Sequence, residues 1–283
     1  MSGETTTKEP LIVIASNRGP YTFKVNDETK ELMATRGAGG LVTALSAVGS
    51  NNDVLWVAAA LGKGDIEWVR KNNGEPQVVD DMRISMIIPE RRRYNLYYNT
   101  ISNPLLWFIQ HELWDTPRQP SITAATWEAW REGYVVMNQR FADAIISAID
   151  GIDRPVLVFP QDYHLYLVPH FLREKMGDKV QIQPFLHIPW PGPDAWRILP
   201  EEMRTELLTS LLMSDRIGFQ TKTDAFNFVQ TCRFYLPNAH SYGSRDSIEF
   251  EGRTVNAVGY PISIDVERVE ELAAAPSTRL IRE

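Results

Sequence analysis

Residues 156–186 read VLVFPQDYHLYLVPHFLREKMGDKVQIQPFL, and this stretch decides the fold class. The apolar run at residues 156–159 is typical of a strand buried on both faces of a sheet. Residues 165–176 then predict a helix that ends at Gly177, and residues 182–186 predict the next strand. A strand, a helix and a second strand in this order form a parallel pair of strands joined by a right-handed crossover.

The same alternation of strands and helices continues on both sides of this unit. Further strands are expected at residues 11–15, 54–60, 77–79, 83–88 and 216–219. Further helices are expected at residues 39–48, 123–149, 200–213 and 223–235. The helix at 123–149 has the clearest pattern, because large apolar residues recur along it at steps of three and four. The sequence therefore predicts an α/β fold, a Rossmann-like parallel sheet with helices on both faces.

Composition and charge exclude several classes of protein. Of the 283 residues, 43% are hydrophobic, which is ordinary for a globular chain. The net charge of −7 argues against a nucleic-acid partner, because such a surface needs cations to neutralise phosphates. Residues 1–10 lack the apolar core of a secretory signal and no apolar run reaches membrane-spanning length, so no membrane contact is expected. The single cysteine, Cys232, fits a buried structural thiol in a reducing compartment, and we expect a cytoplasmic protein.

Four polar segments mark the edge of the predicted sheet where ligands of parallel sheets gather. The first, Ser16-Asn17-Arg18, offers a guanidinium whose planar fork suits phosphate, although an arginine in a surface loop explains it equally well. The second, residues 36–40 (RGAGG), brings glycines that let backbone N–H groups approach a diphosphate. It matches neither the dinucleotide-binding nor the ATP-binding loop pattern, so a plain flexible turn is the simpler alternative.

The third and fourth segments carry a carboxylate and an imidazole. Asp162, within residues 161–164 (QDYH), can hold sugar hydroxyls or a developing positive charge, and the alternative role for it is a helix N-cap. His187 opens residues 187–191 (HIPWP), a loop that two prolines make stiff. A histidine held rigidly at a strand end favours a functional role over that of a core histidine.

Aromatic residues and an arginine cluster lie between the second and third polar segments. Tyr98 and Trp107 can supply stacking faces for a sugar ring, although most aromatic residues at such spacing belong to the core. Residues 91–93 (RRR) can bind phosphate or form a solvated charged turn. No metal site is expected, because the five histidines are scattered and no HxxxH or CxxC motif occurs.

Taken together, these segments resemble the trehalose-6-phosphate synthase family of retaining glycosyltransferases. The matching motifs, in the family's order, are SNR at 16–18, GGL at 39–41, YYN at 97–99, SN at 102–103, LW at 106–107, DYHL at 162–165, HIPWP at 187–191, GFQT at 218–221 and YPI at 260–262. Each motif is short, but the ordered set covers nearly the whole chain, which makes the resemblance specific.

The resemblance implies a GT-B architecture, in which two Rossmann-like domains face each other across a cleft. This chain would supply the N-terminal domain, which chiefly binds the acceptor. By motif match, Arg18 would contact the acceptor phosphate, and Tyr98 and Trp107 would line that pocket. Gly39 and Gly40 would lie against the donor diphosphate.

Asp162 and His187 would be the catalytic residues, in contact with the reacting sugars at the floor of the cleft. The acceptor hydroxyl in such enzymes attacks on the side from which the diphosphate departs. Catalysis would then depend on positioning and charge stabilisation, with no covalent protein nucleophile.

The resemblance also implies partners and a domain division. The partners would be a sugar-phosphate acceptor, a nucleotide-sugar donor and a C-terminal donor domain in the same or a separate chain, with no metal or organic cofactor. Residues 1–10 would form a disordered tail, residues 11–265 the Rossmann-like acceptor-binding domain, and residues 266–283 a linker or tail leading toward the donor domain. The donor nucleotide, the acceptor and the formation of homo-oligomers stay open, and this chain alone is expected to turn over little or nothing.

Three positions depart from the family pattern. Residues 56–60 (WVAAA) stand where the family has a Gly-Trp-Ser-Gly setting, and Gln161 replaces the usual histidine before DYH. Trp190 replaces the phenylalanine between the two prolines, and with residues 196–200 (WRILP) it resembles the validoxylamine phosphate synthase branch, which couples cyclitols without forming a true glycosidic bond. Three functions therefore stay open: the acceptor half of a glycosyltransferase, the same half of a cyclitol-coupling pseudo-glycosyltransferase, and a non-catalytic subunit of a complete synthase.

Overall fold

A computed structural model of the chain describes residues 9–26, 28–29, 31–37, 53–80, 82–115, 121–243, 245–263 and 266–275. The helix expected at residues 39–48 lies outside these ranges, and so do Gly39, Gly40 and residues 1–8 of the expected N-terminal tail. The predictions made for these segments stay predictions.

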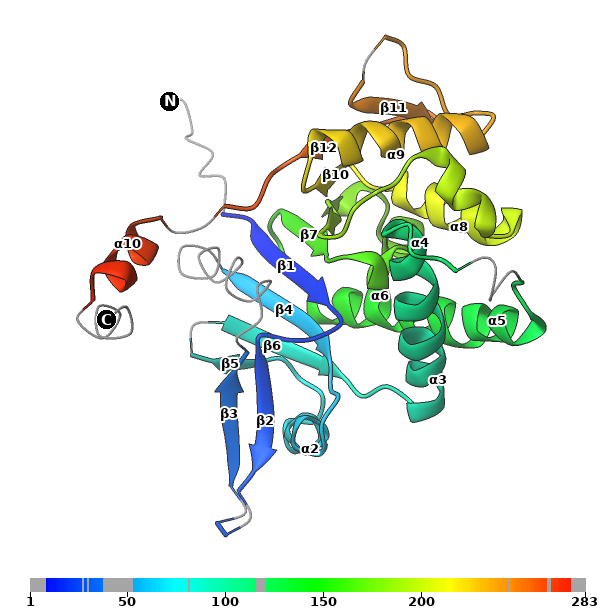
Figure 1. The fold of residues 1–283 in the computed structure, drawn as a ribbon. Helices are drawn as coiled ribbons and strands as arrows, with labels where there is room; N and C mark the ends of the chain where they lie inside the picture. The colour runs from blue at the N-terminus through cyan, green and yellow to red at the C-terminus, as the bar shows by residue number, and fades with distance from the viewer. Residues whose placement is uncertain are drawn as a thin grey trace, which may run out of the picture.

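A mainly parallel sheet forms the centre of the molecule (Figure 1). Its strands are β1 (Leu11–Ser16), β4 (Val54–Ala59), β5 (Gln77–Val79), β6 (Met82–Ile87), β7 (Val156–Pro160), β8 (Gln181–Ile182), β9 (Phe185–Leu186), β10 (Arg216–Phe219), β11 (Ser247–Phe250) and β12 (Arg253–Gly259). One ladder has the order β5-β6-β4-β1-β7-β8 and a second has the order β11-β12-β10-β9. Within these two ladders of the described residues, only the outermost strands β5 and β11 pair antiparallel with their neighbours. The α/β fold class is confirmed, and β11 and β12 are additions to the predicted strands.

The strand expected at residues 182–186 is interrupted, which corrects that prediction. Its first part, β8, pairs with β7, and its second part, β9, pairs with β10. Between the two parts lies Gln183-Pro184, and the proline has no N–H to donate to a ladder. The Pro184 carbonyl instead accepts the Gly218 N–H at 2.8 Å, while the Gln183 N–H donates to the Val158 carbonyl at 2.8 Å. The segment therefore changes its partner strand at Pro184 and connects the two ladders.

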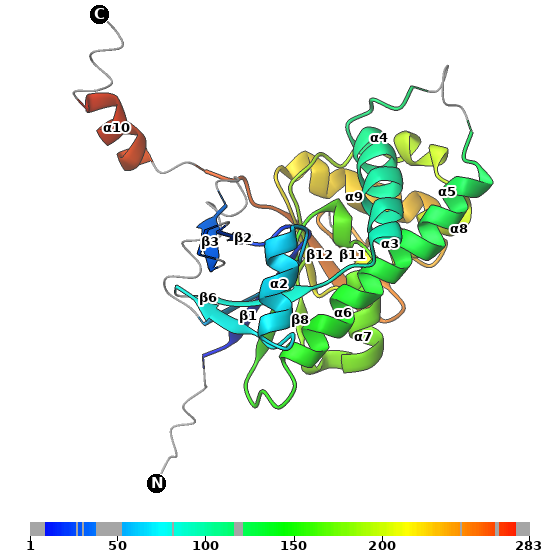
Figure 2. The ribbon, with the colours of Figure 1, turned by 90° about the horizontal axis from the view of Figure 1, so that it is seen from below.

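Alternate residues of the central strands face two separate cores. Leu55 and Val57 of β4 belong to the larger core, and Trp56 and Ala58 belong to the smaller one. The residues of β4 that face each core are all apolar. The strand is therefore a continuous hydrophobic run, as expected in a sheet covered on both faces. Figure 2 shows the helices of the larger core on one side of the sheet.

The helices and helical turns of the described chain are α2 (Lys63–Lys71), α3 (Arg91–Leu96), η1 (Tyr97–Trp107), α4 (Phe108–Gln110), α5 (Ala124–Glu128), η2 (Ala129–Val135), α6 (Val136–Ala148), η3 (Tyr163–Leu165), α7 (Val168–Met176), η4 (Gly177–Lys179), η5 (Pro193–Ile198), α8 (Glu201–Leu211), α9 (Lys222–Tyr235) and α10 (Val266–Ala274). The consecutive α5, η2 and α6 confirm the long helix expected at residues 123–149. The helix expected to start at residue 165 starts at Val168, because a 3-10 turn comes first.

A helix at residues 91–110, made of α3, η1 and α4, was not predicted. Its middle part, η1, is π-helical and contains Pro104. A π-helix bonds residues five apart, so its apolar residues do not recur with the period of 3.6 that marks an α-helix in sequence. This helix brings Tyr98 beside η3 at the carboxyl edge of the sheet, where the Tyr98 ring stacks on His164.

An antiparallel hairpin of β2 (Tyr21–Val25) and β3 (Leu32–Arg36) was also not predicted. Asp65, at the start of α2, fixes it by accepting the Phe23 N–H at 2.7 Å. The Phe23 ring stacks on Trp68 with centroids 4.4 Å apart. A Cβ added at Gly64 would come within 2.1 Å of the Phe23 carbonyl oxygen, so only glycine permits this approach of helix and hairpin.

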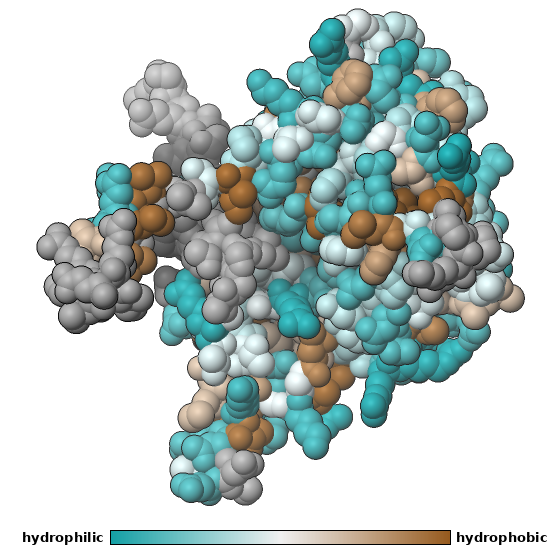
Figure 3. Space-filling model, viewed as in Figure 1, coloured by the Kyte–Doolittle hydropathy of each residue, from teal (hydrophilic) through white to brown (hydrophobic). Residues whose placement is uncertain are grey.

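The helix α10 lies in the segment expected to be a linker or tail, residues 266–283. Figure 1 shows it apart from the sheet and its helices. Val266, Val269 and Leu272 are each about half exposed, and apolar atoms gather over α10 at the left of Figure 3. In the described ranges, no helix combines the length and the apolar character that crossing a membrane requires.

Candidate active site at the carboxyl edge of the sheet

Asp162 lies two residues beyond the end of β7 in a strained backbone conformation, with φ 70° and ψ 176°. Its N–H donates to the Phe185 carbonyl at 2.7 Å, which ties the turn to β9. Its Oδ1 accepts the backbone N–H of His187 at 3.2 Å, and the side chain makes no capping hydrogen bond to the following turn. Asp162 thus stands at the N-cap position of η3, but its carboxylate joins the ends of β7 and β9 and does not cap that turn.

Burial raises the pKa of Asp162 to about 7, and hydrogen bonds from the backbone N–H groups of His187, Tyr163 and Ile188 only partly oppose this effect. The ionisation of a carboxyl group with such a pKa responds to nearby charge. A cation or a developing positive charge beside it favours its ionised form. This property fits the role of stabilising charge at a reacting sugar.

His187 follows β9 and is bracketed by two glutamines. Its Nε2 lies 2.9 Å from Gln161 Oε1, and its Nδ1 lies 3.5 Å from Gln220 Nε2. Burial lowers the pKa of His187 to about 4, so the ring is neutral at physiological pH. Asp162 and His187, predicted from separate strand ends, are thus brought together.

A chain of buried hydrogen bonds holds the loop that carries Arg18. The indole N–H of Trp56 donates to Ser16 Oγ at 2.8 Å, and the Ser16 hydroxyl donates to the Arg18 carbonyl at 2.6 Å. Asn17 Nδ2 lies 3.1 Å from the Tyr94 hydroxyl, and the Tyr94 hydroxyl lies 3.2 Å from Asn17 Oδ1. The backbone of the loop is therefore fixed from β4 on one side and from α3 on the other.

The backbone of this loop is fixed, but the guanidinium of Arg18 is not. The residue is exposed, and among the described residues its side chain has no hydrogen bond or ion pair. An unpaired planar cation at this edge suits a phosphate, which it can bind through two parallel hydrogen bonds.

Aromatic rings form a stacked column beside Arg18. Tyr98 stacks on Tyr94 with centroids 5.5 Å apart and on His164 with centroids 5.6 Å apart. Burial and the charge of Arg18 lower the pKa of His164 to about 3, so this ring is neutral and packs as an aromatic. Tyr163 adjoins the column and donates its hydroxyl to Asn103 Oδ1 at 2.8 Å. Tyr98 is partly exposed, but its ring faces are engaged with Tyr94 and His164, so its stacking on a sugar ring stays a prediction.

Trp107 lies farther along the same helix than Tyr98. Its ring stacks on His111 with centroids 4.0 Å apart and meets Phe108 edge-on. Its placement in the acceptor pocket stays a prediction, and so does the donor role of Gly39 and Gly40, which lie outside the described residues.

The arginine cluster at residues 91–93 forms the start of α3. Arg92 pairs with Glu128, and Arg93 pairs with Glu90 at 2.9 Å. These pairs tie α3 to its surroundings on an exposed face, which favours the solvated alternative over phosphate binding for Arg92 and Arg93.

Sequence reasoning missed the residues that hold the site together, namely Trp56, Tyr94, Gln161 and Gln220. Trp56 sits in a buried strand and carries an indole N–H that must find a partner, which is a usable signal. Nothing in the sequence signals the roles of the two glutamines, since their partners come from other strands.

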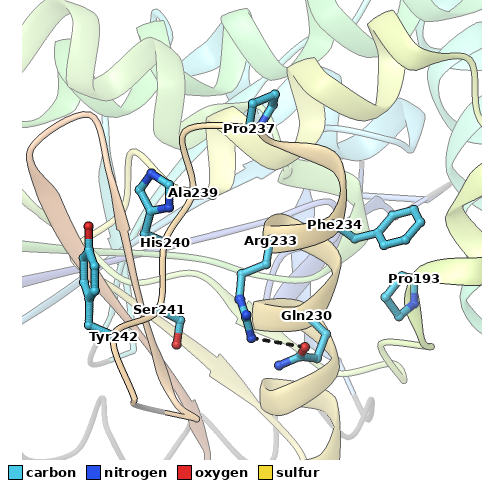
Figure 4. Close-up of a pocket in the computed structure, with 9 residues that line it drawn as sticks. All are labelled: Pro193, Gln230, Arg233, Phe234, Pro237, Ala239, His240, Ser241 and Tyr242. Carbon is cyan, nitrogen blue, oxygen red and sulfur yellow. Dashed lines mark hydrogen bonds between the residues drawn. The ribbon is translucent and has the colours of Figure 1, made fainter.

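The described residues contain no group of three or more His, Cys, Asp or Glu side chains arranged to hold a metal ion. A hollow of about 490 Å³ lies away from the strand ends, between the end of α9 and the loop after it (Figure 4). Its lining includes Arg233, His240 and Tyr242 and none of the predicted site residues. The carboxyl edge thus offers a buried carboxyl group bonded to the backbone of His187, an aromatic column and a free guanidinium, which together suit a phosphorylated sugar.

Comparison with known proteins agrees with this geometry. Residues 10–282 match the model of glycosyltransferase family 20. The alpha,alpha-trehalose-phosphate synthase (UDP-forming) 1 of Aspergillus fumigatus is 30% identical over 94% of this chain and 49% of its own length.

Two solved structures share the fold. The N-terminal domain of Candida albicans trehalose-6-phosphate phosphatase has a TM-score of 0.74 at 23% identity, over 100% of this chain and 54% of that one. The alpha,alpha-trehalose-phosphate synthase (UDP-forming) of Burkholderia xenovorans, in complex with glucose-6-phosphate, has a TM-score of 0.70 at 23% identity, over 96% of this chain and 55% of that one. The chain thus spans about half the length of the relatives it matches, and its fold is that of the N-terminal half of a GT-B protein.

Proposed function

The chain belongs to glycosyltransferase family 20, and on that premise we propose that it is the acceptor-binding half of a retaining, trehalose-6-phosphate synthase-like transferase. The complete enzyme moves glucose from a nucleotide sugar to a sugar phosphate. The names of the relatives, UDP-forming synthases, favour UDP as the donor nucleotide, and the glucose-6-phosphate bound to the Burkholderia structure favours that acceptor.

The observation that carries the proposal is the free guanidinium of Arg18 beside the aromatic column. A sugar phosphate presents an anion and a ring in one molecule. Arg18 supplies the cation, the partly exposed Tyr98 belongs to the aromatic column beside it, and the Trp56–Ser16 and Ser16–Arg18 hydrogen bonds hold the loop of Arg18 in place. Such preorganisation lowers the entropic cost of binding.

Asp162 and His187 occupy the place where the reacting sugars meet in this proposal. The Asp162 carboxylate accepts a hydroxyl of the bound sugar and stabilises positive charge as the bond to the diphosphate breaks. His187 keeps Asp162 in place through its backbone N–H. No protein nucleophile is needed, because the acceptor hydroxyl itself attacks and the departing diphosphate takes up its proton.

Trp107 lines the acceptor pocket in this proposal, and Gly39 and Gly40 approach the diphosphate. A donor-binding half, in the same or a separate chain, supplies the cations that hold the nucleotide. The proposal includes no metal and no organic cofactor. It also implies that this chain alone releases nucleoside diphosphate slowly or not at all.

The cyclitol-coupling alternative was suggested by Trp190 and Trp196. Both are fully buried and stack on each other with centroids 4.3 Å apart, and Trp190 donates its indole N–H to Thr231 Oγ1 at 3.2 Å. The two indole side chains pack within the larger core and are not exposed. They therefore carry no argument for a cyclitol over a sugar, and a sugar phosphate stays the proposed acceptor.

Isothermal titration calorimetry tests the proposal. Glucose 6-phosphate should bind saturably, and Arg18→Ala should weaken binding by about 10–100-fold, as expected for loss of charge-assisted hydrogen bonds. Arg233→Ala is the matched control, because Arg233 is also an exposed arginine but lies in the hollow of Figure 4.

Glucose without phosphate should bind too weakly to detect. If a cyclitol phosphate binds and glucose 6-phosphate does not, the acceptor assignment is wrong although the site is correct. If Arg18→Ala and Arg233→Ala behave alike, Arg18 is not the phosphate ligand and the proposal fails.

A further inference from the structure

The two glutamines beside His187 determine which nitrogen of its ring carries the proton. A glutamine side chain can donate from Nε2 or accept at Oε1, and the two ends are told apart only by their hydrogen-bond partners. Both glutamines here also contact a backbone group, and a backbone group can only donate or only accept. Each amide is therefore fixed independently of the histidine.

Gln161 is fixed by the end of β7. Its Nε2 lies 2.9 Å from the Phe159 carbonyl oxygen, which can only accept. Its Oε1, 2.9 Å from His187 Nε2, must then be the acceptor of that second contact. Gln161 is almost fully buried, at 2% exposure, so the amide has no water with which to exchange partners. The Nε2 atom of His187 consequently carries a proton.

Gln220 is fixed by the chain that leaves β12. Its Oε1 accepts the backbone N–H of Ile262 at 3.1 Å, and this group can only donate. Its Nε2 therefore points at His187 Nδ1 as a donor, at 3.5 Å. The Nδ1 atom must then present its lone pair. The two glutamines, fixed by different parts of the chain, require the same state of the ring.

We propose that Gln161 and Gln220 are positioning residues that hold His187 as the neutral Nε2–H tautomer, and that Gln220 couples this histidine to the chain leaving β12 at Ile262. Asp162 does not take part in this assignment, because it bonds the backbone N–H of His187 and not its ring. Gln161 sets the tautomer, since its contact is much shorter than that of Gln220. Gln220 provides the coupling.

The tautomer limits what His187 can do at the site. Its Nε2–H is already engaged with Gln161, so Nδ1 is the ring atom at which partners can exchange. Nδ1 can accept a hydrogen bond from a sugar hydroxyl and cannot donate one to a departing phosphate. A hydroxyl bound there would displace Gln220 and would weaken its hold on the Ile262 amide. The segment that leads away from the sheet would then respond to occupancy of the site.

The meaning of this coupling for catalysis rests on the proposed function, but the tautomer and the link to Ile262 do not. Long-range ¹H–¹⁵N NMR of the chain labelled at histidine reads the tautomer of each ring directly. The five histidines are assigned by substitution, with His187→Gln identifying the relevant signal. We expect His187 to be protonated at Nε2 alone at pH 7. An Nδ1–H signal, or a mixture of tautomers, would overturn the proposal without touching the assignment of Arg18.

Two carboxylate substitutions test the roles of the glutamines. Gln161→Glu places an anion beside the Nε2–H group and should raise the proton affinity of His187 at least about tenfold, as an adjacent carboxylate does. Gln220→Glu removes the donor to Nδ1 and should raise the proton affinity as well, by less. Gln181→Glu is the matched control, because Gln181 is exposed on β8. Equal NMR titration curves for Gln161→Glu and Gln181→Glu would contradict the proposal.

The coupling has its own readout, hydrogen exchange of the Ile262 amide. Gln220→Leu removes the acceptor of that amide and should speed its exchange at least about tenfold. His187→Phe keeps the ring volume but removes the acceptor for Gln220, and it should also speed exchange at Ile262. An unchanged exchange rate in His187→Phe would show that the histidine and the segment are not coupled.

Discussion

The two sides of the candidate site are built differently. On the reacting-sugar side, which comprises Gln161, Asp162 and His187, each side chain is hydrogen-bonded to groups that the backbone holds in place. On the phosphate side, which comprises the loop of Arg18 with Tyr94 and Tyr98, the loop is fixed but the guanidinium is free. The difference shows two ways of preparing for a ligand. Uncharged polar groups can be fixed in advance, whereas a cation that meets a phosphate is kept in water until the phosphate arrives.

The largest expected effect concerns the core beneath the reacting-sugar side. Trp190 is fully buried in a cluster with Trp196 and Phe228. Trp190→Ala should lower the free energy of unfolding by about 3–5 kcal/mol through lost burial and a residual cavity. Arg18→Ala should change it by no more than about 0.5 kcal/mol. Urea denaturation of both variants measures the contrast, and similar losses in the two would mean that the phosphate side also carries fold stability.

A second substitution asks whether the loop of Arg18 is as rigid as its hydrogen bonds indicate. Ser16→Ala leaves the indole N–H of Trp56 buried without a partner, which should cost about 1–3 kcal/mol in unfolding free energy. It should also weaken glucose 6-phosphate binding, because the Arg18 carbonyl loses its anchor. Ser16→Thr keeps the hydroxyl and is the control. Weaker binding in both variants to the same degree would assign the effect to packing and not to the hydroxyl.

Asp162 allows the backbone strain on the reacting-sugar side to be measured. Its φ of 70° favours glycine, so Asp162→Gly should be more stable than Asp162→Ala by about 1–2 kcal/mol. Both variants lose the same carboxylate, and the comparison isolates the backbone. Thermal denaturation of the pair is sufficient, and equal stabilities would indicate that the turn relaxes once the side chain is gone.

The smallest expected effect is on the pH dependence of stability. Asp162 has a folded pKa of about 7, above its ordinary value of 3.8, so its contribution to stability falls as pH rises between these values. His187, with a folded pKa of about 4 and an ordinary value of 6.5, has the opposite sign, and its contribution rises with pH across that interval. The two effects therefore oppose each other between about pH 4 and 6.5.

Asp162→Asn removes one of these two opposing effects. Between pH 5 and pH 6, stability of the variant should rise with pH more steeply than that of the unsubstituted chain, by at most about 1.4 kcal/mol per pH unit. Urea denaturation at several pH values measures both slopes. Parallel curves would show that Asp162 is more solvated than its surroundings indicate.

Much of the fold was predictable because its strands are short apolar runs and most of its helices have a regular period. The exceptions have physical causes. The π-helix η1 obscures the usual helical spacing, and Pro184 divides one apolar run between two strands. The hairpin of β2 and β3 depends on Asp65 and Gly64, whose contacts with it arise only after folding.

The site was predictable in outline by the rule that parallel strands direct ligands to their carboxyl ends. That rule selected Asp162, His187 and the loop of Arg18, and the structure places Asp162 against His187. It could not select Gln161 and Gln220, because the sequence around a glutamine does not show which groups its amide will bond. Their importance depends on which backbone groups lie nearby, and this information exists only in three dimensions.

The strained backbone of Asp162 also affects how readily mutation and selection would replace this residue. Every aspartate codon becomes a glycine codon by one base change, and glycine is the residue that this φ angle favours. A population selected only for folded protein should therefore lose Asp162 readily, whereas one selected for sugar transfer should keep it despite the strain. Deep sequencing of a mutagenised pool under the two regimes would reveal, at a single codon, whether selection acts on this chain for its chemistry or only for its shape.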